Sequence, residues 1–198
     1  MTLSVVVKPE KNYFKLLSVK QHYALDDREL RQLKKRAREL QRHYHPDRYK
    51  TATPQEQRLA AQFSSHINAA TQTLTNPVDR AIHMLGLIGL EAEQIENTIN
   101  DTAFLMQQMQ LREELDHARI TNSQLELEGT ANKIDAYFLD LQQQFSVLLV
   151  ELDANALSVG RGFIDDNYSD KLFKLVDKMQ FFSKLSGEAQ AALTELSV

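Results

Sequence analysis

Apolar residues in the first half of the chain recur at helical spacing. Between Asp27 and Tyr44 they fall at positions 30, 33, 37, 40 and 44, which places them on one side of a helix. Asp26 and Glu29 form a capping-box start for this helix, and the proline after His45 ends it. The pattern therefore predicts an amphipathic helix with one buried stripe.

A second long helix is predicted after a short loop. Thr53 can cap it, Pro54 suits its first position, and Glu56 completes a capping box. Shorter helices are expected over residues 13–19, after the cap residue Asn12, and from residue 77 to about 87, where Gly86 and Gly89 break the pattern. The long helix should contribute these core residues: Leu59, Phe63, Ile67, Ala70 and Leu74.

The second half of the chain contains three further amphipathic segments, which predict a three-helix bundle. The first follows the cap residue Asp101 and runs to about Arg119. The others cover residues 134–152 and 168–182, with Gly160 and Gly162 between them. We therefore expect an all-α protein with four parts: an N-terminal extension (1–10), a helical domain (11–88), a junction (89–100) and a C-terminal bundle (101–198).

Composition narrows the possible chemistry. The 198 residues include no cysteine, which excludes disulfides, Cys-ligated metal centres and thiol nucleophiles. The longest apolar runs are too short for a membrane span, and the N-terminus lacks the features of a signal or transit peptide. We expect a soluble protein of the bacterial cytoplasm that needs no cofactor and no metal.

Charge is distributed unevenly along the chain. Eight Lys or Arg residues against three carboxylates give residues 28–48 a local charge of +5, whereas residues 91–128 carry −7. Opposed fields of this kind guide and orient partners more than they stabilise a fold. Two different partners are therefore plausible.

The tripeptide His45-Pro46-Asp47 follows directly on the basic helix. Pro46 stiffens the turn, and the Asp47 carboxylate suits a bidentate arginine of a partner. At 100° per residue, five basic side chains lie on a face roughly 135° from the apolar stripe: Arg31, Lys34, Lys35, Arg38 and Arg42.

A helical hairpin with a His-Pro-Asp (HPD) loop and an outward basic face resembles the J-domain of DnaJ-type co-chaperones, over about residues 11–86. The resemblance implies an antiparallel hairpin and a DnaK-class, ATP-driven chaperone as partner. It also implies that the loop triggers ATP hydrolysis in that chaperone. The chaperone-binding residues would be the basic face together with His45, Pro46 and Asp47.

The same residues also fit other interpretations. His45 alone could satisfy helix C-terminal carbonyls, and His43 lies about 200° from it, too far for both to bind one metal. A basic stripe alone also fits nucleic acid, but the downstream acidity opposes a polyanion partner. Adjacent carboxylates such as Glu113 and Glu114 diverge on a helix, and no nucleophile triad or phosphate loop occurs, so no enzyme is expected.

The segment 101–116, DTAFLMQQMQLREELD, closely resembles the corresponding helix of the HscB family, co-chaperones of iron-sulfur cluster assembly. Phe104, Leu111, Leu115 and Ala118 form the face that docks this helix. A second apolar face lies roughly 150° away, and Phe181 is similarly displaced from the core stripe of the last helix. An exposed, Met-containing face is typical of a protein-binding site, with burial under the first domain as the alternative.

The family resemblance implies that this face binds the scaffold protein IscU. It also implies that the chaperone partner is HscA. It implies an L-shaped co-chaperone that delivers IscU to HscA, stimulates HscA and binds neither nucleic acid nor membrane. The alternatives are a co-chaperone of general DnaK with a different client, and a nucleic-acid-binding helical regulator. The scaffold-binding residues implied by the resemblance are Leu105, Met106, Met109, Arg112, Glu113 and Phe181.

Overall fold

The computed structural model describes residues 10–90, 101–159 and 166–196, and within these ranges every regular element is helical. The expectation of an all-α protein is confirmed. The chain divides into two compact units, Met1–Ile88 and Gly89–Val198. Almost all of the predicted N-terminal extension, most of the predicted junction, and Gly160 and Gly162 lie outside the described residues.

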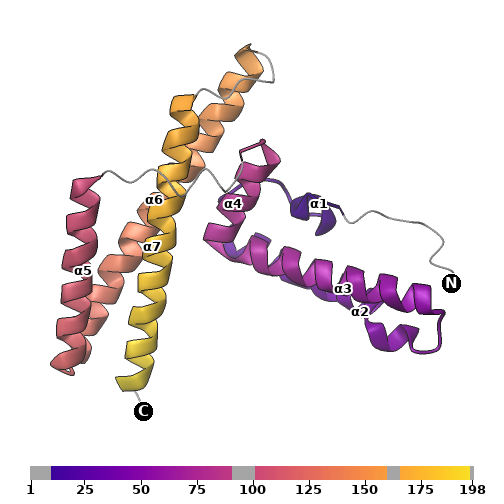
Figure 1. Ribbon diagram of the computed structural model, residues 1–198, viewed down its shortest axis with the longest axis horizontal. Coiled ribbons are helices and arrows are strands. Elements are labelled where there is room, and N and C mark those ends of the chain that lie inside the picture. Colours follow the sequence, from indigo (N-terminus) through magenta and orange to yellow (C-terminus); the bar gives the residue numbers. More distant parts are fainter. Residues whose placement is uncertain (1–9, 91–100, 160–165, 197–198) are drawn as a thin grey trace. The chain divides into compact units, whose positions relative to one another are not determined.

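The first unit is built on two long helices that lie side by side, α2 (Asp27–Tyr44) and α3 (Pro54–Thr75) (Figure 1). Their facing stripes bury Leu33 and Ala37 of α2 against Ile67 of α3. The predicted Leu30, Leu40, Tyr44, Leu59 and Phe63 are only partly buried. The main core cluster of this unit consists of Phe14, Leu17, Leu33, Ala37, Ile67, Ala70 and Leu74.

The helix starts follow the local signals in the sequence. Asp26 and Glu29 form the predicted capping box at α2, and Thr53 and Glu56 form the one at α3. Backbone N–H groups in the first turn of each helix therefore have hydrogen-bond partners. Asn76 caps α4 (Pro77–Leu87) by accepting hydrogen bonds from two backbone N–H groups. The two predicted capping boxes and the predicted helix from residue 77 to about 87 are confirmed.

In the first unit, the end of the first helix and the role of Gly86 differ from expectation. The first helix, α1 (Tyr13–Leu16), stops before Val19 because Ser18 adopts a φ of 53°, a left-handed conformation that no right-handed helix continues through. Gly86 lies inside α4 and does not break it. The break comes at Gly89, whose φ of 87° suits a residue without a Cβ.

His83 on α4 holds the start of α1 in place. The backbone N–H of Tyr13 donates to His83 Nε2 at 3.2 Å, and the two rings stack with centroids 4.4 Å apart. The ring of His66, on α3, meets Tyr13 edge-on at 5.3 Å. Burial lowers the pKa of His83 below its ordinary value, since a charged imidazolium is poorly solvated there.

The lowered pKa of His83 predicts that the stability of the fold depends on pH. The unfolded chain binds the proton at the ordinary His pKa of about 6.5, whereas the folded chain binds it only at lower pH. The His83 contribution is therefore complete above about pH 6.5 and is lost as pH falls through the folded pKa. Moreover, a protonated Nε2 cannot accept the Tyr13 N–H.

We expect the thermal midpoint of the wild type to fall from pH 7.5 to pH 5.5 by more than that of His83→Gln, whose amide oxygen accepts a hydrogen bond without titrating. Circular dichroism melts at both pH values measure this difference. Equal pH dependence in the two proteins would show that His83 is not responsible.

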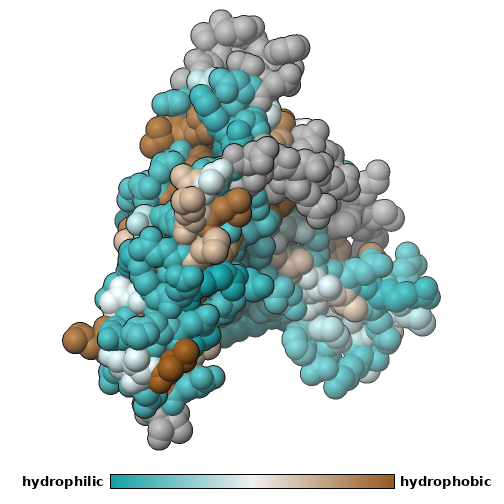
Figure 2. Space-filling model, turned by 60° about the vertical axis from the view of Figure 1, so that its left-hand side comes forward, coloured by the Kyte–Doolittle hydropathy of each residue, from teal (hydrophilic) through white to brown (hydrophobic). Residues whose placement is uncertain are grey.

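The second unit contains α5 (Thr102–Ile120), α6 (Gln124–Val159) and α7 (Asp166–Leu196). In Figure 1, α6 and α7 run together over their length, and α5 lies beside their lower part. The predicted docking face of α5, Phe104, Leu111, Leu115 and Ala118, is buried, so that prediction is confirmed. The face of this unit that Figure 2 shows is largely hydrophilic, with small apolar patches.

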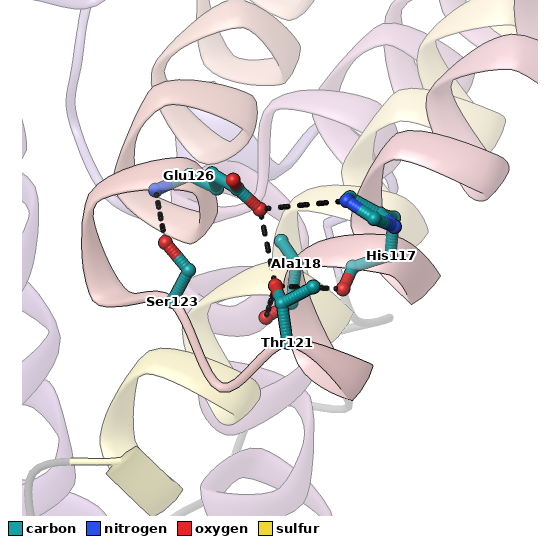
Figure 3. A network of polar contacts seen from close by, with 5 residues as sticks. All are labelled: His117, Ala118, Thr121, Ser123 and Glu126. Carbon is teal, nitrogen blue, oxygen red and sulfur yellow. Dashed lines mark hydrogen bonds and ion pairs between the residues drawn. The ribbon is translucent and has the colours of Figure 1, made fainter.

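A polar network at the turn between α5 and α6 fixes the direction of α5 (Figure 3). The Thr121 hydroxyl lies 3.1 Å from Glu126 Oε2 and 3.0 Å from the carbonyl oxygen of His117. His117 Nε2 approaches the same Glu126 oxygen at 3.9 Å, and Asn122 turns the chain with a φ of 52°. Asn tolerates this left-handed conformation better than most residues, so the turn returns the chain tightly into α6.

None of the helices in the described ranges combines the length and apolar character that crossing a membrane requires.

Candidate functional site

The HPD tripeptide forms a tight, polar turn at the end of α2. His45 leaves the helix with extended backbone angles, and Pro46 opens a single 3-10 turn, η1 (Pro46–Tyr49). The backbone N–H of Asp47 donates to His45 Nδ1 at 3.2 Å. The His45 side chain therefore caps the turn, which fixes the backbone on which Asp47 is carried.

The Asp47 side chain is 65% exposed, and its Oδ1 lies 3.2 Å from Nζ of Lys50. Such an exposed pair contributes about 0.2–1 kcal/mol, so a partner's cation can replace the lysine at little cost. Asp47 is therefore an accessible carboxylate on a rigid turn.

Arg48 and Tyr49, which follow the tripeptide, attach the turn to α2. This role was not anticipated from the sequence. The Arg48 guanidinium donates to the carbonyl oxygen of Arg42 at 3.2 Å, and the Tyr49 hydroxyl donates to that of His43 at 3.3 Å. Both carbonyls belong to the last turn of α2, where they lack helical partners. A basic residue close after a helix end was the available signal.

The loop beyond η1 is fastened from α3. The Gln57 side-chain amide donates to the carbonyl oxygens of Lys50 and Ala52, at 3.1 and 3.0 Å. At the other end of the turn, the rings of Tyr44 and Phe63 stack at 4.9 Å between α2 and α3. The turn is therefore anchored on both helices of the hairpin.

The five basic residues predicted on the outer face of α2, Arg31, Lys34, Lys35, Arg38 and Arg42, are all exposed. At the C-terminal end this face continues into a hollow beside the HPD turn, lined by Arg38, Gln41, Arg42, His45 and Arg48. Three guanidinium groups around one hollow favour a partner that carries carboxylates.

The second candidate site begins with the exposed face of α5. Asp101 caps the helix by accepting the backbone N–H of Phe104 at 3.0 Å. Beyond it, Leu105, Met106 and Met109 are 48%, 66% and 63% exposed. In Figure 2, which turns the side bearing α5 forward, apolar side chains gather within a hydrophilic surround.

Phe181 on α7 joins this face through contacts with α5. It is half-buried, and its ring meets that of Phe104 edge-on at 5.7 Å. The Arg112 guanidinium lies over the same ring, with its central carbon 5.6 Å from the centroid. Arg112 and Glu113 are exposed. The structure therefore brings Arg112 and Phe181 together across two helices, which helical periodicity alone does not predict.

Lys178 is a further residue that the sequence did not single out. Its Nζ lies 2.7 Å from Asp101 Oδ2, and this contact, with the N–H of Phe104, lowers the pKa of the Asp101 carboxyl. On the other side of α5, Glu114 pairs with Lys133 of α6 at 2.9 Å, which lowers the pKa of Glu114. These pairs hold α5 to both of its neighbours.

The two sites offer different chemistry. The HPD turn and the basic face present charge on a rigid backbone, whereas the α5–α7 face presents flexible apolar side chains bordered by Arg112 and Glu113. Methionine-containing faces adapt their shape to a partner surface. Both sites are therefore suited to protein contacts.

Comparison with known proteins agrees with this architecture. The family model described as "HSCB C-terminal oligomerisation domain" matches residues 100–190. The chain is 36% identical over 179 residues to the co-chaperone protein HscB homolog of Shewanella halifaxensis, with 89% of this chain and 94% of the relative covered. The corresponding protein of Shewanella pealeana is 37% identical over the same coverage.

Solved structures show the same arrangement of helices. The chaperone HscB from Vibrio cholerae matches with a TM-score of 0.74 and 28% identity, covering 93% of this chain and 99% of that one. The human co-chaperone HscB, at 22% identity, shares the fold with a TM-score of 0.76, covering 93% of this chain and 83% of that one. Sequence identity across almost the whole chain, together with this fold, shows that the protein belongs to the HscB family of co-chaperones.

Proposed function

We propose that this protein binds the iron-sulfur scaffold IscU through its second unit and presents it to the DnaK-class chaperone HscA. The first unit, acting as a J-domain, then stimulates ATP hydrolysis by HscA and so supports iron-sulfur cluster maturation. The observation that carries the proposal is the pairing of two exposed sites of different chemistry on two separate units.

The scaffold site consists of Leu105, Met106, Met109, Arg112, Glu113 and Phe181. Covering each exposed apolar side chain would stabilise a complex by about 1.5–3 kcal/mol relative to leaving it in water. Arg112, held over the Phe181 ring, would keep its outer N–H groups available for a carboxylate of the scaffold. Specificity would then come from the polar border and affinity from the apolar centre.

The chaperone site consists of His45, Pro46 and Asp47 with the basic face of α2. Its role would be to favour a hydrolysis-competent conformation of the partner, which is a shift of population and needs no acid–base group from this chain. Binding both partners at once would raise the local concentration of scaffold at the chaperone. The proposal places the protein in the bacterial cytoplasm, and the two Shewanella relatives support a bacterial origin.

The test is the ATPase rate of purified HscA with this protein alone, with IscU alone, and with both. We expect stimulation by the pair to exceed the sum of the separate effects, because tethering couples the two binding events. A merely additive result would contradict delivery of the scaffold. Replacing HscA by general DnaK in the same assay separates the specialised partner from the general one.

A further inference from the structure

An alternating series of contacts connects the first turn of α5 with α7. Lys178 Nζ lies 2.7 Å from Asp101 Oδ2 and 5.0 Å from the centroid of the Phe104 ring. Phe104 meets Phe181 edge-on, and Phe181 carries Arg112 above its ring. The series therefore crosses repeatedly between the two helices, so a displacement at Asp101 reaches the residues of the proposed scaffold site.

The Asp101 carboxylate performs two tasks with different oxygens. Oδ1 accepts the backbone N–H of Phe104 and caps α5, while Oδ2 binds Lys178 of α7. The position of the helix start is thereby linked to one residue on the neighbouring helix. At the other end of α5, the Arg119 guanidinium donates to the carbonyl oxygen of Glu188, at 2.8 Å. The exposed apolar face of α5 lies between these two attachments.

We propose that Asp101 and Lys178 are positioning residues for scaffold binding, which set the register of α5 on α7 and so keep Arg112 over Phe181. The inference rests on the proposed function for its consequence, although the register itself can be measured without any partner. Neither residue belongs to the exposed apolar face.

Substitutions at two positions test this role while preserving the helix cap. Asp101→Asn retains an amide oxygen that can accept the Phe104 N–H, since Asn is a favourable capping residue, but removes the charge that binds Lys178. Lys178→Gln removes the ammonium over Phe104, and Lys178→Arg retains a cation. The matched control is Asp170→Asn, which breaks the 2.6 Å pair between Asp170 and Lys174 within α7 alone.

The direct measurement is ¹⁹F NMR with 4-fluorophenylalanine at Phe181 in the full-length protein. We expect the resonance to shift or broaden in Asp101→Asn and Lys178→Gln, and to stay close to the wild type in Lys178→Arg and Asp170→Asn. Unchanged spectra in both Asp101→Asn and Lys178→Gln would overturn the positioning role.

Calorimetric titration with purified IscU measures the consequence for binding. When only part of the population holds α5 in register, the dissociation constant rises in proportion, and we expect an increase of about threefold to tenfold. Lys178→Arg should restore most of the affinity. Wild-type affinity in Asp101→Asn, despite an altered ¹⁹F signal, would overturn the link to binding. If the wild-type protein does not bind IscU, the proposed function fails, and the ¹⁹F experiment still decides the register.

Discussion

Replacing Asp47 by asparagine is expected to remove most of the stimulation of the partner chaperone while leaving the fold intact. The carboxylate is exposed, and its charged or titratable neighbours, Lys50 at 3.2 Å and His45 Nδ1 at 3.8 Å, are exposed as well, so the fold loses little when its charge is removed. A partner's cation left without its carboxylate costs about 2–5 kcal/mol of coupling. At about 1.4 kcal/mol for each factor of ten, stimulation should fall at least twentyfold.

The measurement is the ATPase rate of the chaperone at saturating co-chaperone. Asp27→Asn is the matched control, because it removes an exposed carboxylate from the opposite end of α2. Lys50→Met releases Asp47 from its internal pair and should leave stimulation at or above the wild-type level. Undiminished stimulation by Asp47→Asn would end the assignment of this turn as the chaperone site.

A triple substitution of Leu105, Met106 and Met109 by alanine is expected to abolish scaffold binding without unfolding the protein. These side chains are exposed in the free molecule, so shortening them removes little buried surface and leaves no cavity. Alanine, moreover, favours the helix. In the complex each truncation should cost about 1–2 kcal/mol. The three losses together should raise the dissociation constant by about a hundredfold or more.

The double substitution Ile120→Ala and Leu125→Ala serves as the control for general loss of exposed apolar surface. These residues flank the α5–α6 turn and are 83% and 81% exposed, but they lie outside the proposed site. Calorimetric titration with IscU should give wild-type affinity for the double variant and no measurable binding for the triple variant. Equal affinity in the triple variant and the wild type would refute the α5 site.

Local rules predicted most of the helices because their signals lie within a few residues of each other. The capping boxes at Asp26 and Thr53, and the buried face of α5, follow directly from spacing. The early end of α1 was not predictable in this way. Ser18 carries no sequence signal for a left-handed φ, and packing of the neighbouring Leu17 into the core, rather than propensity, sets the end of the helix.

In the candidate sites, too, local features were predictable and contacts between helices were not. Exposure of the basic face of α2, and the separation of Leu105, Met106 and Met109 from the docking face of α5, were predictable, because each depends on the periodicity of one helix. Periodicity left open whether the first domain covers the second face of α5. The contacts of Arg112 with Phe181, and of Asp101 with Lys178, join residues more than 65 positions apart. Such pairs depend on how α5 rests against α7, which no single helical pattern determines.

The wide separation in sequence between α5 and α7 has a consequence during synthesis on the ribosome. The HPD turn is complete once α2 and α3 have emerged, since all the hydrogen bonds described above for it arise within residues 42–57. Phe181, by contrast, belongs to the last helix to be translated. Under the proposed function, the unit that contacts the ATP-driven chaperone therefore matures ahead of the unit that holds the scaffold.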